Sequence, residues 1–336
     1  MECNILAVSD GKLKKVLQAG YNSLVWECCY FKTGAIQAVF PVTIDTLKHI
    51  KTGNFLSLSI DATSSSGGYP LAYIHTVEIK ETEIWAYAYE AKELLKKCIV
   101  DNWLDSENVL TSDILEDAFA DYIPFNWVHS TPILDGITAT LNPAAYSYGT
   151  VYDLIADACR ANNAGWRLEY DDYNEKAVMF CWVGADKTNT AIFAKSHGNM
   201  RDSSYTESDK NYINTVIALG SDNITQMYTE SYTGDAYTAL LDLREEYPRP
   251  DDMSVADYQA AILTRAKMSC IARHKTTATK ANDINTDDFN KTYQIGDLVK
   301  MVVVERGTYV VSDTRRVTAA TYVVDRGAQK VRLTIE

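Results

Sequence analysis

Few side chains in this sequence have the types and spacing that catalysis requires. Cys270 and His274 lie four residues apart in a segment of helical periodicity, so they share one helix face and could form a nucleophile and base pair. Cys270 is better explained as a small core residue, and His274 as a rim residue favoured by the helix dipole. Paired carboxylates occur in four segments with the composition of turns, at Asp171-Asp172, Glu245-Glu246, Asp251-Asp252 and Asp287-Asp288. Acidic residues in turns solvate the chain or bond its backbone, so we do not expect an enzyme.

Motifs that hold metals and cofactors are missing from the sequence. The five histidines stand alone, and the seven cysteines include no Cys-x-x-Cys pair. No Gly-x-Ser-x-Gly elbow, Gly-x-x-x-x-Gly-Lys-Ser/Thr loop or Gly-x-Gly-x-x-Gly turn occurs. The sequence therefore predicts no catalytic residue, no metal ligand and no cofactor, and it predicts reduced thiols packed in the interior.

Composition limits the class of protein further. The chain has 336 residues, with 32 Lys and Arg against 45 Asp and Glu and a formal net charge of -13. Its length suits two domains, and 46% hydrophobic residues can form a sizeable core. An acidic chain is a poor general binder of nucleic acid, because that affinity comes from Lys and Arg. No stretch approaches the roughly 20 apolar residues of a membrane span, and the start lacks signal-peptide features, so we expect a soluble protein made in a cytoplasm.

Strands are predicted over most of the N-terminal part of the chain. Residues 24–31 and 37–41 flank a Gly turn and predict a hairpin. A strand is predicted at 55–61, and a second hairpin at 72–79 and 83–89. Apolar residues then recur at helical spacing over residues 90–99, so a β-rich unit closed by a helix is expected.

Helices and one clear hairpin are predicted in the middle of the chain. Residues 112–119 follow a Ser-Asp cap, and residues 151–162 form a second helical pattern that stops at a Gly. Apolar and polar residues then alternate over 165–170 and 177–182 on either side of a polar turn. This alternation predicts an antiparallel hairpin.

The C-terminal part is predicted to contain one long helix and then only strands. Residues 254–274 suit an amphipathic helix that begins after a Pro-Arg-Pro sequence. Four β-rich runs broken by Gly turns follow, at residues 295–305, 308–313, 316–325 and 328–335. Such runs predict a meander or a small barrel.

Charge is distributed unevenly along the chain. Residues 101–176 carry 14 acidic and 3 basic side chains, whereas residues 290–336 carry 8 basic and 5 acidic ones. This asymmetry is typical of differently solvated faces. It also suits a subunit with one acidic face and another that docks on an acidic neighbour.

Five segments follow one another in an order that has a family resemblance. Residues 25–41 contain a Trp, a Gly turn and a strand that closes in Pro. Residues 180–188 form a strand that ends in Gly-Ala-Asp-Lys-Thr, and residues 192–200 contain Ile-Phe and then Gly-Asn-Met. An Asn-initiated strand ending in Gly occupies 214–220, and Tyr-Gln-Ile-Gly-Asp-Leu-Val occupies 293–299. This order resembles the hub or tail-associated proteins at the distal end of siphophage tails.

The resemblance covers about residues 20–335 and implies a fold similar to that of baseplate-hub proteins. The implied class is α+β and β-rich, with two β-barrel-like hub domains and helical insertions. We expect the first part of an N-terminal hub domain at 1–100, an α+β insertion with an acidic face at 101–200, and a helix plus a C-terminal barrel-like domain at 201–336. Ten motif residues are expected to serve as scaffold: Gly34, Pro41, Gly184, Asp186, Thr188, Asn199, Asn214, Gly220, Gly296 and Asp297.

The resemblance also implies a structural role in the virion. Three copies are expected to form a homotrimeric ring that joins the tail tube or distal tail protein to a spike, fibre or tape-measure protein and gates DNA ejection. A net charge of -13 suits a wall past which DNA slides as cargo, and 22 Tyr suit broad protein interfaces. Lys187 stands where the family more often has Arg, and Met200 where it has Leu. Synthesis is expected in the bacterial host cytoplasm.

Two other functions remain open at this point. Aromatic residues that look exposed suggest a module that binds host cell-wall carbohydrate, namely Trp103, Trp127, Tyr146 and Tyr148. A wall-degrading or peptidase enzyme rests only on Cys270, His274 and the acidic doublets. Because the chain ends directly after the last predicted strand, we expect any lysin or spike to be another polypeptide.

Overall fold

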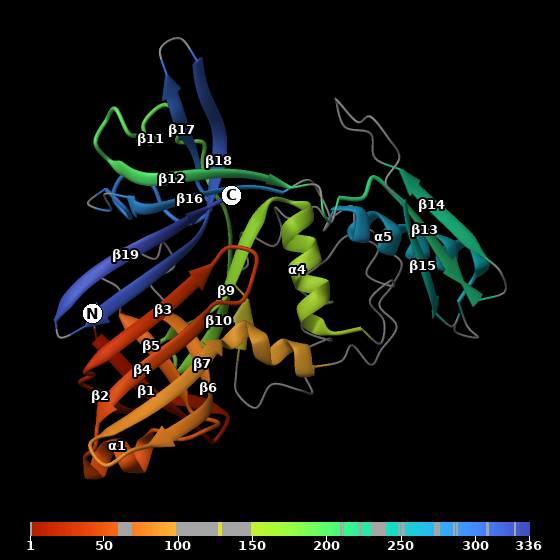
Figure 1. Cartoon of the computed structure of the whole chain (residues 1–336). Coiled ribbons are helices and arrows are strands. Elements are labelled where there is room, and N and C mark those ends of the chain that lie inside the picture. The colour runs from red at the N-terminus through yellow and green to blue at the C-terminus, as the bar shows by residue number, and fades with distance from the viewer. Residues whose placement is uncertain are drawn as a thin grey trace.

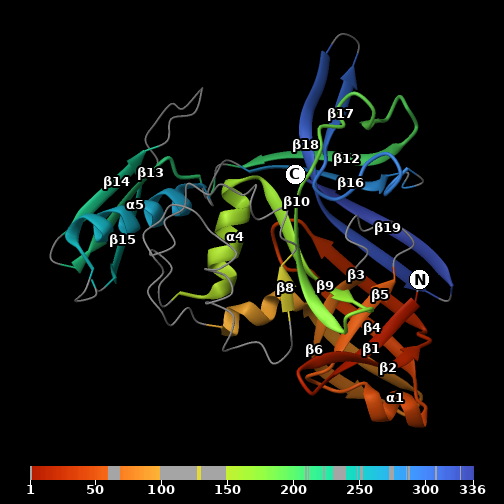
Figure 2. The same cartoon turned by 180° about the vertical axis from the view of Figure 1, so that it is seen from behind.

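Strands dominate the structure, which Figures 1 and 2 show from opposite sides. The computed structural model describes residues 2–59, 69–98, 127–129, 149–208, 210, 212–221, 224–229, 240–247, 249, 253–271, 276–284, 286, 288–306, 309–325 and 327–336. These residues form a 16-stranded sheet network and a separate 3-stranded sheet. No helix within them is long and apolar enough to cross a membrane.

The N-terminal part is an antiparallel sheet in the order β3-β4-β7-β6-β5-β1-β2. Its strands are β1 (Glu2–Ser9), β2 (Lys12–Ala19), β3 (Ser23–Cys29), β4 (Ala35–Pro41), β5 (Phe55–Ser59), β6 (Tyr69–Ile79) and β7 (Glu83–Glu90). The two predicted hairpins are confirmed as β3–β4 and β6–β7. The short helix α1 (Ile44–His49) adds to the expected elements, because Thr43 and Thr46 form a capping box at its start.

A second layer is built by the middle of the chain. The predicted hairpin is confirmed as β9 (Ala164–Asp171) and β10 (Lys176–Val183), and the strand β8 (Trp127–His129) pairs parallel with β10. The helix α4 (Val151–Ala161) is also confirmed, with Thr150 as its N-cap. The helix predicted at 112–119 lies outside the described residues.

The helix expected at 90–99 is a shorter 3₁₀ helix, η1 (Ala91–Lys97). The side chain of Lys92 is fully buried there, and its Nζ atom lies 3.1 Å from each of the carbonyl oxygens of Cys29 and Trp166. Glu90, the residue before η1, still belongs to β7 and has an extended ψ of 134°. These buried contacts fix the turn after β7 and override the helical spacing of the apolar residues.

The C-terminal strands extend the same network of paired strands. They are β11 (Ile192–Ala194), β12 (Met200–Ser208), β16 (Thr276–Ile284), β17 (Leu298–Arg306), β18 (Tyr309–Asp325) and β19 (Ala328–Ile335). The runs predicted separately at 308–313 and 316–325 form the single 17-residue strand β18. β18 pairs with β17 over its first half and with both β19 and β3 over its second half.

Through β18 the N-terminal and C-terminal strands belong to one network. The fold is β-rich with few helices, as expected. Among the described strands no closed ring of pairs occurs, since the main path ends at β12 and at β2. The finer expectation of two barrel-like domains is therefore not confirmed.

A small unit lies to one side of this network in both views (Figures 1 and 2). It contains β13 (Thr215–Gly220), β14 (Thr225–Thr229), β15 (Leu240–Tyr247) and the helix α5 (Val255–Ile271). The predicted helix is confirmed, but it is buried on two faces. Tyr258 and Ile262 pack on the small sheet, whereas Ala261 and Met268 join the cluster around α4.

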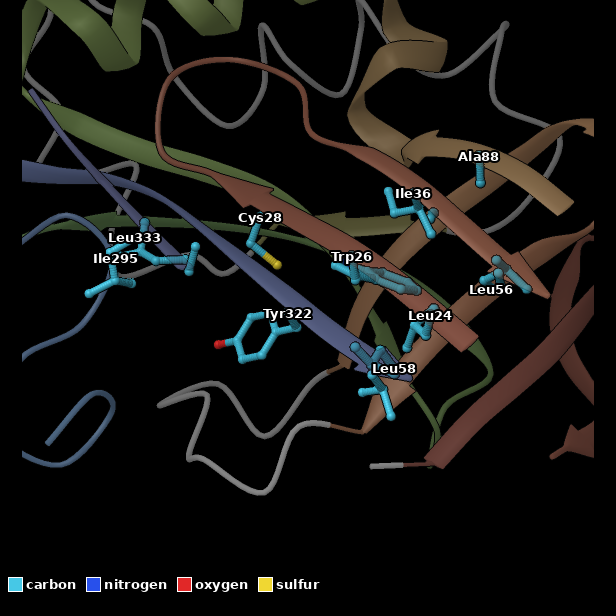
Figure 3. Packing of buried hydrophobic residues seen from close by; sticks show 14 of the residues in the cluster. Leu24, Trp26, Cys28, Ile36, Leu56, Leu58, Ala88, Ile295, Tyr322 and Leu333 are labelled. Carbon is cyan, nitrogen blue, oxygen red and sulfur yellow. The ribbon is translucent and has the colours of Figure 1, made fainter. Parts of the chain in front are cut away.

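The main core lies on the inner face of the N-terminal sheet and extends under β18 and β19. Figure 3 shows Leu24, Trp26 and Cys28 along β3, with Tyr322 of β18 beside them. Trp26 is fully buried and lies opposite Tyr322 in the strand register. Burial of each such large side chain contributes about 1.5–3 kcal/mol to folding. All seven cysteines are buried free thiols, which confirms the expected packed thiols.

Candidate functional site: a junction around Tyr30

Two segments that are distant in sequence meet around Tyr30, which follows β3. One is the chain 182–188 at the end of β10, and another is the chain 293–298 that leads into β17. Asp186 and Leu298 form a parallel bridge between these two segments. The backbone of Leu298 donates to the carbonyl of Ala185 at 2.9 Å. We call this meeting point the Tyr30 junction.

Two glycines allow the backbones of the junction to touch. A Cβ atom on Gly184 would lie 1.7 Å from the carbonyl oxygen of Gly296. Gly296 itself has a φ of +99°, and a Cβ there would lie 2.4 Å from the ring of Tyr30. Glycine is therefore required at position 184 because any side chain would clash with the facing backbone. At position 296 it is required both because a side chain would clash with Tyr30 and because φ is positive.

Asp297 joins the two segments through its carboxylate. It is 2% exposed, and its Oδ1 atom accepts a hydrogen bond of 2.8 Å from the backbone N–H of Ala185. Its Oδ2 atom accepts one of 3.0 Å from the backbone N–H of Gln294. A buried carboxylate with a backbone donor from a different segment on each oxygen acts as a structural clamp.

Tyr30 holds the junction together from its centre. Its hydroxyl donates to the carbonyl of Asn163 at 2.6 Å and accepts from the N–H of Gly184 at 3.1 Å. Trp182 meets its ring edge-on at 5.4 Å, and the guanidinium of Arg316 lies 5.3 Å from the ring centroid. Burial raises the pKa of the Tyr30 phenol, so the group stays protonated and can donate.

Asp186 and Thr188 form an exposed turn at the edge of the junction. The backbone N–H and the hydroxyl of Thr188 both donate to Asp186 Oδ1, at 2.9 and 2.6 Å. The hydrogen bond from the Thr188 hydroxyl lowers the pKa of Asp186. Lys187 takes part through its main chain, donating to the carbonyl of Leu298 at 2.8 Å. An Arg at this position would make the same backbone bond.

The remaining motif residues lie elsewhere in the fold. Asn199 closes the loop after β11, where its side chain accepts from Ala194 N at 2.9 Å and donates to Ile192 O at 2.7 Å. Asn214 precedes β13 in the small unit, and Gly220 is the last residue of that strand. A Cβ on Gly220 would lie 2.2 Å from the side chain of Ile262 on α5.

Gly34 and Pro41 stand at the two ends of β4. The N–H of Gly34 donates to Glu90 Oε2 at 2.8 Å, and a Cβ on Gly34 would lie 2.0 Å from the carbonyl oxygen of Glu27. The carbonyl of Pro41 accepts from the hydroxyl of Thr46 at 2.8 Å. The structure thus brings Gly184, Asp186, Thr188, Gly296 and Asp297 together and leaves the other five motif residues apart.

A buried ion pair near the junction has no counterpart in the sequence predictions. Lys92 Nζ lies 3.1 Å from Glu90 Oε2, with the side chains 0% and 4% exposed. Glu90 Oε1 also accepts from the backbone of Cys29 at 3.3 Å. The pair ties the turn after β3 to the start of η1. Its only signal in the sequence is a Glu and a Lys at alternate positions, which is too common to be diagnostic.

The described residues offer little for covalent or metal chemistry. Burial raises the pKa of the Cys3 and Cys28 thiols to about 12, so neither is a thiolate nucleophile near neutral pH. Cys270 is buried with its Sγ atom 3.4 Å from the carbonyl of Ile213, and His274 lies outside the described residues. No group of three or more His, Cys, Asp or Glu that could hold a metal occurs in the described part of the chain.

Comparison with known proteins identifies the family. The family model for Siphovirus ReqiPepy6 Gp37-like protein matches residues 6–335. The chain is a member of this family. The family resemblance read from the sequence is thereby confirmed. No match is found among curated proteins.

Solved structures with the same fold are also known. The 43 kDa tail protein of prophage MuSo2 from Shewanella oneidensis aligns with 100% of this family member and 98% of its own chain, at 12% identity and a TM-score of 0.56. The prophage tail protein gp18 from Listeria monocytogenes EGD-e aligns over 100% and 94%, at 10% identity and the same TM-score. A chain of the Francisella PdpA-VgrG complex aligns over 99% and 57%, at 9% identity and 0.53. Family and fold together support a structural role in a phage tail for this Gp37-like protein.

Proposed function

We propose that the protein is a hub subunit at the distal end of a siphophage tail, and that three copies form a ring there. The observation that carries this proposal is the end-to-end match. The family model spans residues 6–335, and the two prophage tail proteins are themselves covered almost completely. The chain is synthesised in the bacterial host cytoplasm and acts as a building block without a cofactor.

In this proposal the ring joins two parts of the tail. On one side lies the tail tube or a distal tail protein, and on the other a spike, a fibre or the tape-measure protein. The fold shared with a chain of the PdpA-VgrG complex supports a partner on the spike side. The ring gates the passage of DNA during ejection. A net charge of -13 suits that passage, because an acidic wall repels phosphates.

We include in the proposal the division of the chain into three parts. Residues 1–100 begin the N-terminal hub domain, residues 101–200 form the α+β insertion with an acidic face, and residues 201–336 complete the hub with a barrel-like domain. The Tyr30 junction supports the hub reading, because it clamps chain from all three parts into one rigid unit.

Native mass spectrometry of the purified full chain tests the assembly. The expected species has three times the 37.6 kDa mass of one chain. Electron microscopy of tails labelled on this subunit then tests its position, and density around the central channel at the distal end is expected. A chain that stays monomeric at assembly concentrations, together with label away from the channel, would contradict the proposal.

A further inference from the structure

The outward face of β7 carries a row of three aromatic side chains, Trp85, Tyr87 and Tyr89, which we call the aromatic ladder. They alternate with residues that are buried in the core, namely Ile84, Ala86 and Ala88. Three rings at every second position of one strand span about 13 Å, at roughly 3.3 Å per residue. The neighbours of β7 in the sheet are β4 and β6.

Two rings of the ladder are held in place by neighbours that cover one side of each. Lys80 Nζ lies 4.0 Å from the ring centroid of Trp85, whose Nε1 atom donates to Glu83 Oε2 at 3.2 Å. His75 stacks on Tyr89 at 4.3 Å with an interplanar angle of 15°. Tyr89 still keeps 42% of its surface exposed. Rings fixed in this way lose little rotamer entropy when a ligand packs on them.

A cavity of about 330 Å³ adjoins the Tyr89 end of the ladder, and we call it the basic pocket. Besides Tyr89, its aromatic lining residues are Phe31 and Tyr152, and its cations are Lys32, Lys96 and Arg160. Its volume lies within the range of small-ligand sites. Three cations at one cavity stand out in a chain whose net charge is -13.

The cations of the basic pocket are only partly neutralised. Lys96 lies 2.8 Å from Glu93, which also lines the pocket, and Arg160 lies 2.7 Å from Asp157. The side chain of Lys32 is 78% exposed, and its contact with Glu336 is long at 3.8 Å. Lys32 is therefore available to a further anion, and the other two can share their donors.

Polar side chains flank the middle of the ladder. Gln37 on β4 and Thr76 on β6 both stand opposite Tyr87 in the strand register. On β4 the apolar Val39, 3% exposed, stands opposite Trp85, and Gln37 lies between Tyr87 and Val25 of β3, which is 37% exposed. Tyr87 therefore has a hydrogen-bonding side chain on each side, and a ring placed in this way suits a ligand that alternates C–H faces with hydroxyls.

We propose that the aromatic ladder and the basic pocket together bind an acidic oligosaccharide. The C–H faces of its sugar rings pack on Trp85, Tyr87 and Tyr89. Hydroxyl groups bond to Gln37 and Thr76, and a carboxylate at the pocket end pairs with the pocket's cations. A hub role requires no glycan site, so this inference goes beyond the proposed function and is tested separately from it.

Calorimetric titration and saturation-transfer NMR on the full chain test the site with two probes. A hyaluronan hexasaccharide carries carboxylates, whereas chitohexaose is neutral and of equal length. We expect saturable binding of hyaluronan that weakens with added salt, and weaker binding of chitohexaose. Tyr89→Ala and Trp85→Ala should each weaken hyaluronan binding about tenfold. Lys32→Gln should weaken hyaluronan binding and leave chitohexaose binding unchanged.

Tyr173→Ala is the matched control, because Tyr173 is 93% exposed in the turn between β9 and β10, and hyaluronan binding should be unchanged. Trp85 is half-buried, so hyaluronan binding by its variant is interpreted only if that variant unfolds at the wild-type temperature. The variant of the more exposed Tyr89 provides an independent measurement. Absence of saturable hyaluronan binding by the wild type would overturn the proposal. Equal loss in the Tyr173 variant would also overturn it.

Discussion

Replacement of Gly184 by Ala is the sharpest test of the Tyr30 junction. The added Cβ would lie 1.7 Å from the carbonyl oxygen of Gly296 and 2.7 Å from the backbone nitrogen of Asp297, so the two segments must separate. Separation weakens three hydrogen bonds: Ala185 N to Asp297 Oδ1, Leu298 N to Ala185 O, and Lys187 N to Leu298 O. At about 1 kcal/mol for each bond, the variant should lose about 3 kcal/mol of unfolding free energy. Overpacking against a rigid backbone gives a loss of similar size.

Urea unfolding followed by tryptophan fluorescence measures this loss, because Trp182 lies within the junction. Gly20→Ala is the matched control: its Cβ would meet nothing within 4 Å, and its backbone has no positive φ. The control should change the unfolding free energy by no more than about 0.5 kcal/mol. Equal stability of the Gly184 variant, the control and the wild type would refute the reasoning, since it would mean that the two segments do not touch.

Three further predictions concern buried groups. Asp297→Asn turns an NH₂ group towards one of the two backbone donors, and should cost about 1–3 kcal/mol in urea unfolding. Lys92→Met leaves Glu90 buried without its partner and should cost about 3–5 kcal/mol, whereas addition of Glu90→Gln should recover part of that loss; no recovery would argue against the ion pair. The pKa of Cys3 rises from 9.0 to about 12, so its contribution to stability is complete below pH 9.0 and is lost as the pH rises towards 12. The native chain should therefore react with a thiol reagent at pH 8 far more slowly than the urea-unfolded chain, and equal rates would contradict the burial.

Most of the helices and strands can be predicted from the periodicity of apolar residues in the sequence. Alternation over β9 and β10 defines their hairpin, because one face of each strand packs into the cluster around α4. The helix α5 also follows from its apolar residues, but its second buried face does not. Burial by a sheet on one side and by α4 on the other leaves no clean polar stripe, so an amphipathic pattern describes only half of its environment.

The Tyr30 junction could not be derived in the same way. Gly184 and Gly296 are far apart in sequence, and nothing in the local pattern around either of them says that their backbones touch. Only the family resemblance places both in one set of scaffold residues. Arg316 belongs to no motif, and Tyr30 lies in the 25–41 segment without being one of the ten scaffold residues. The roles of both depend on long-range packing that only the folded chain creates.

The strand β18 sets how a mechanical load travels through the molecule. Its first half pairs only with β17, whereas its second half is held between β19 and β3. A force applied along the hairpin of β17 and β18 therefore loads the hydrogen bonds of β18 with β19 and β3 in shear. These bonds share the force and do not break one after another. Displacement of that hairpin moves β3, and β3 leads directly into Tyr30. Under tension on the β17–β18 hairpin, the N-terminal and C-terminal strands should thus rotate together as one body.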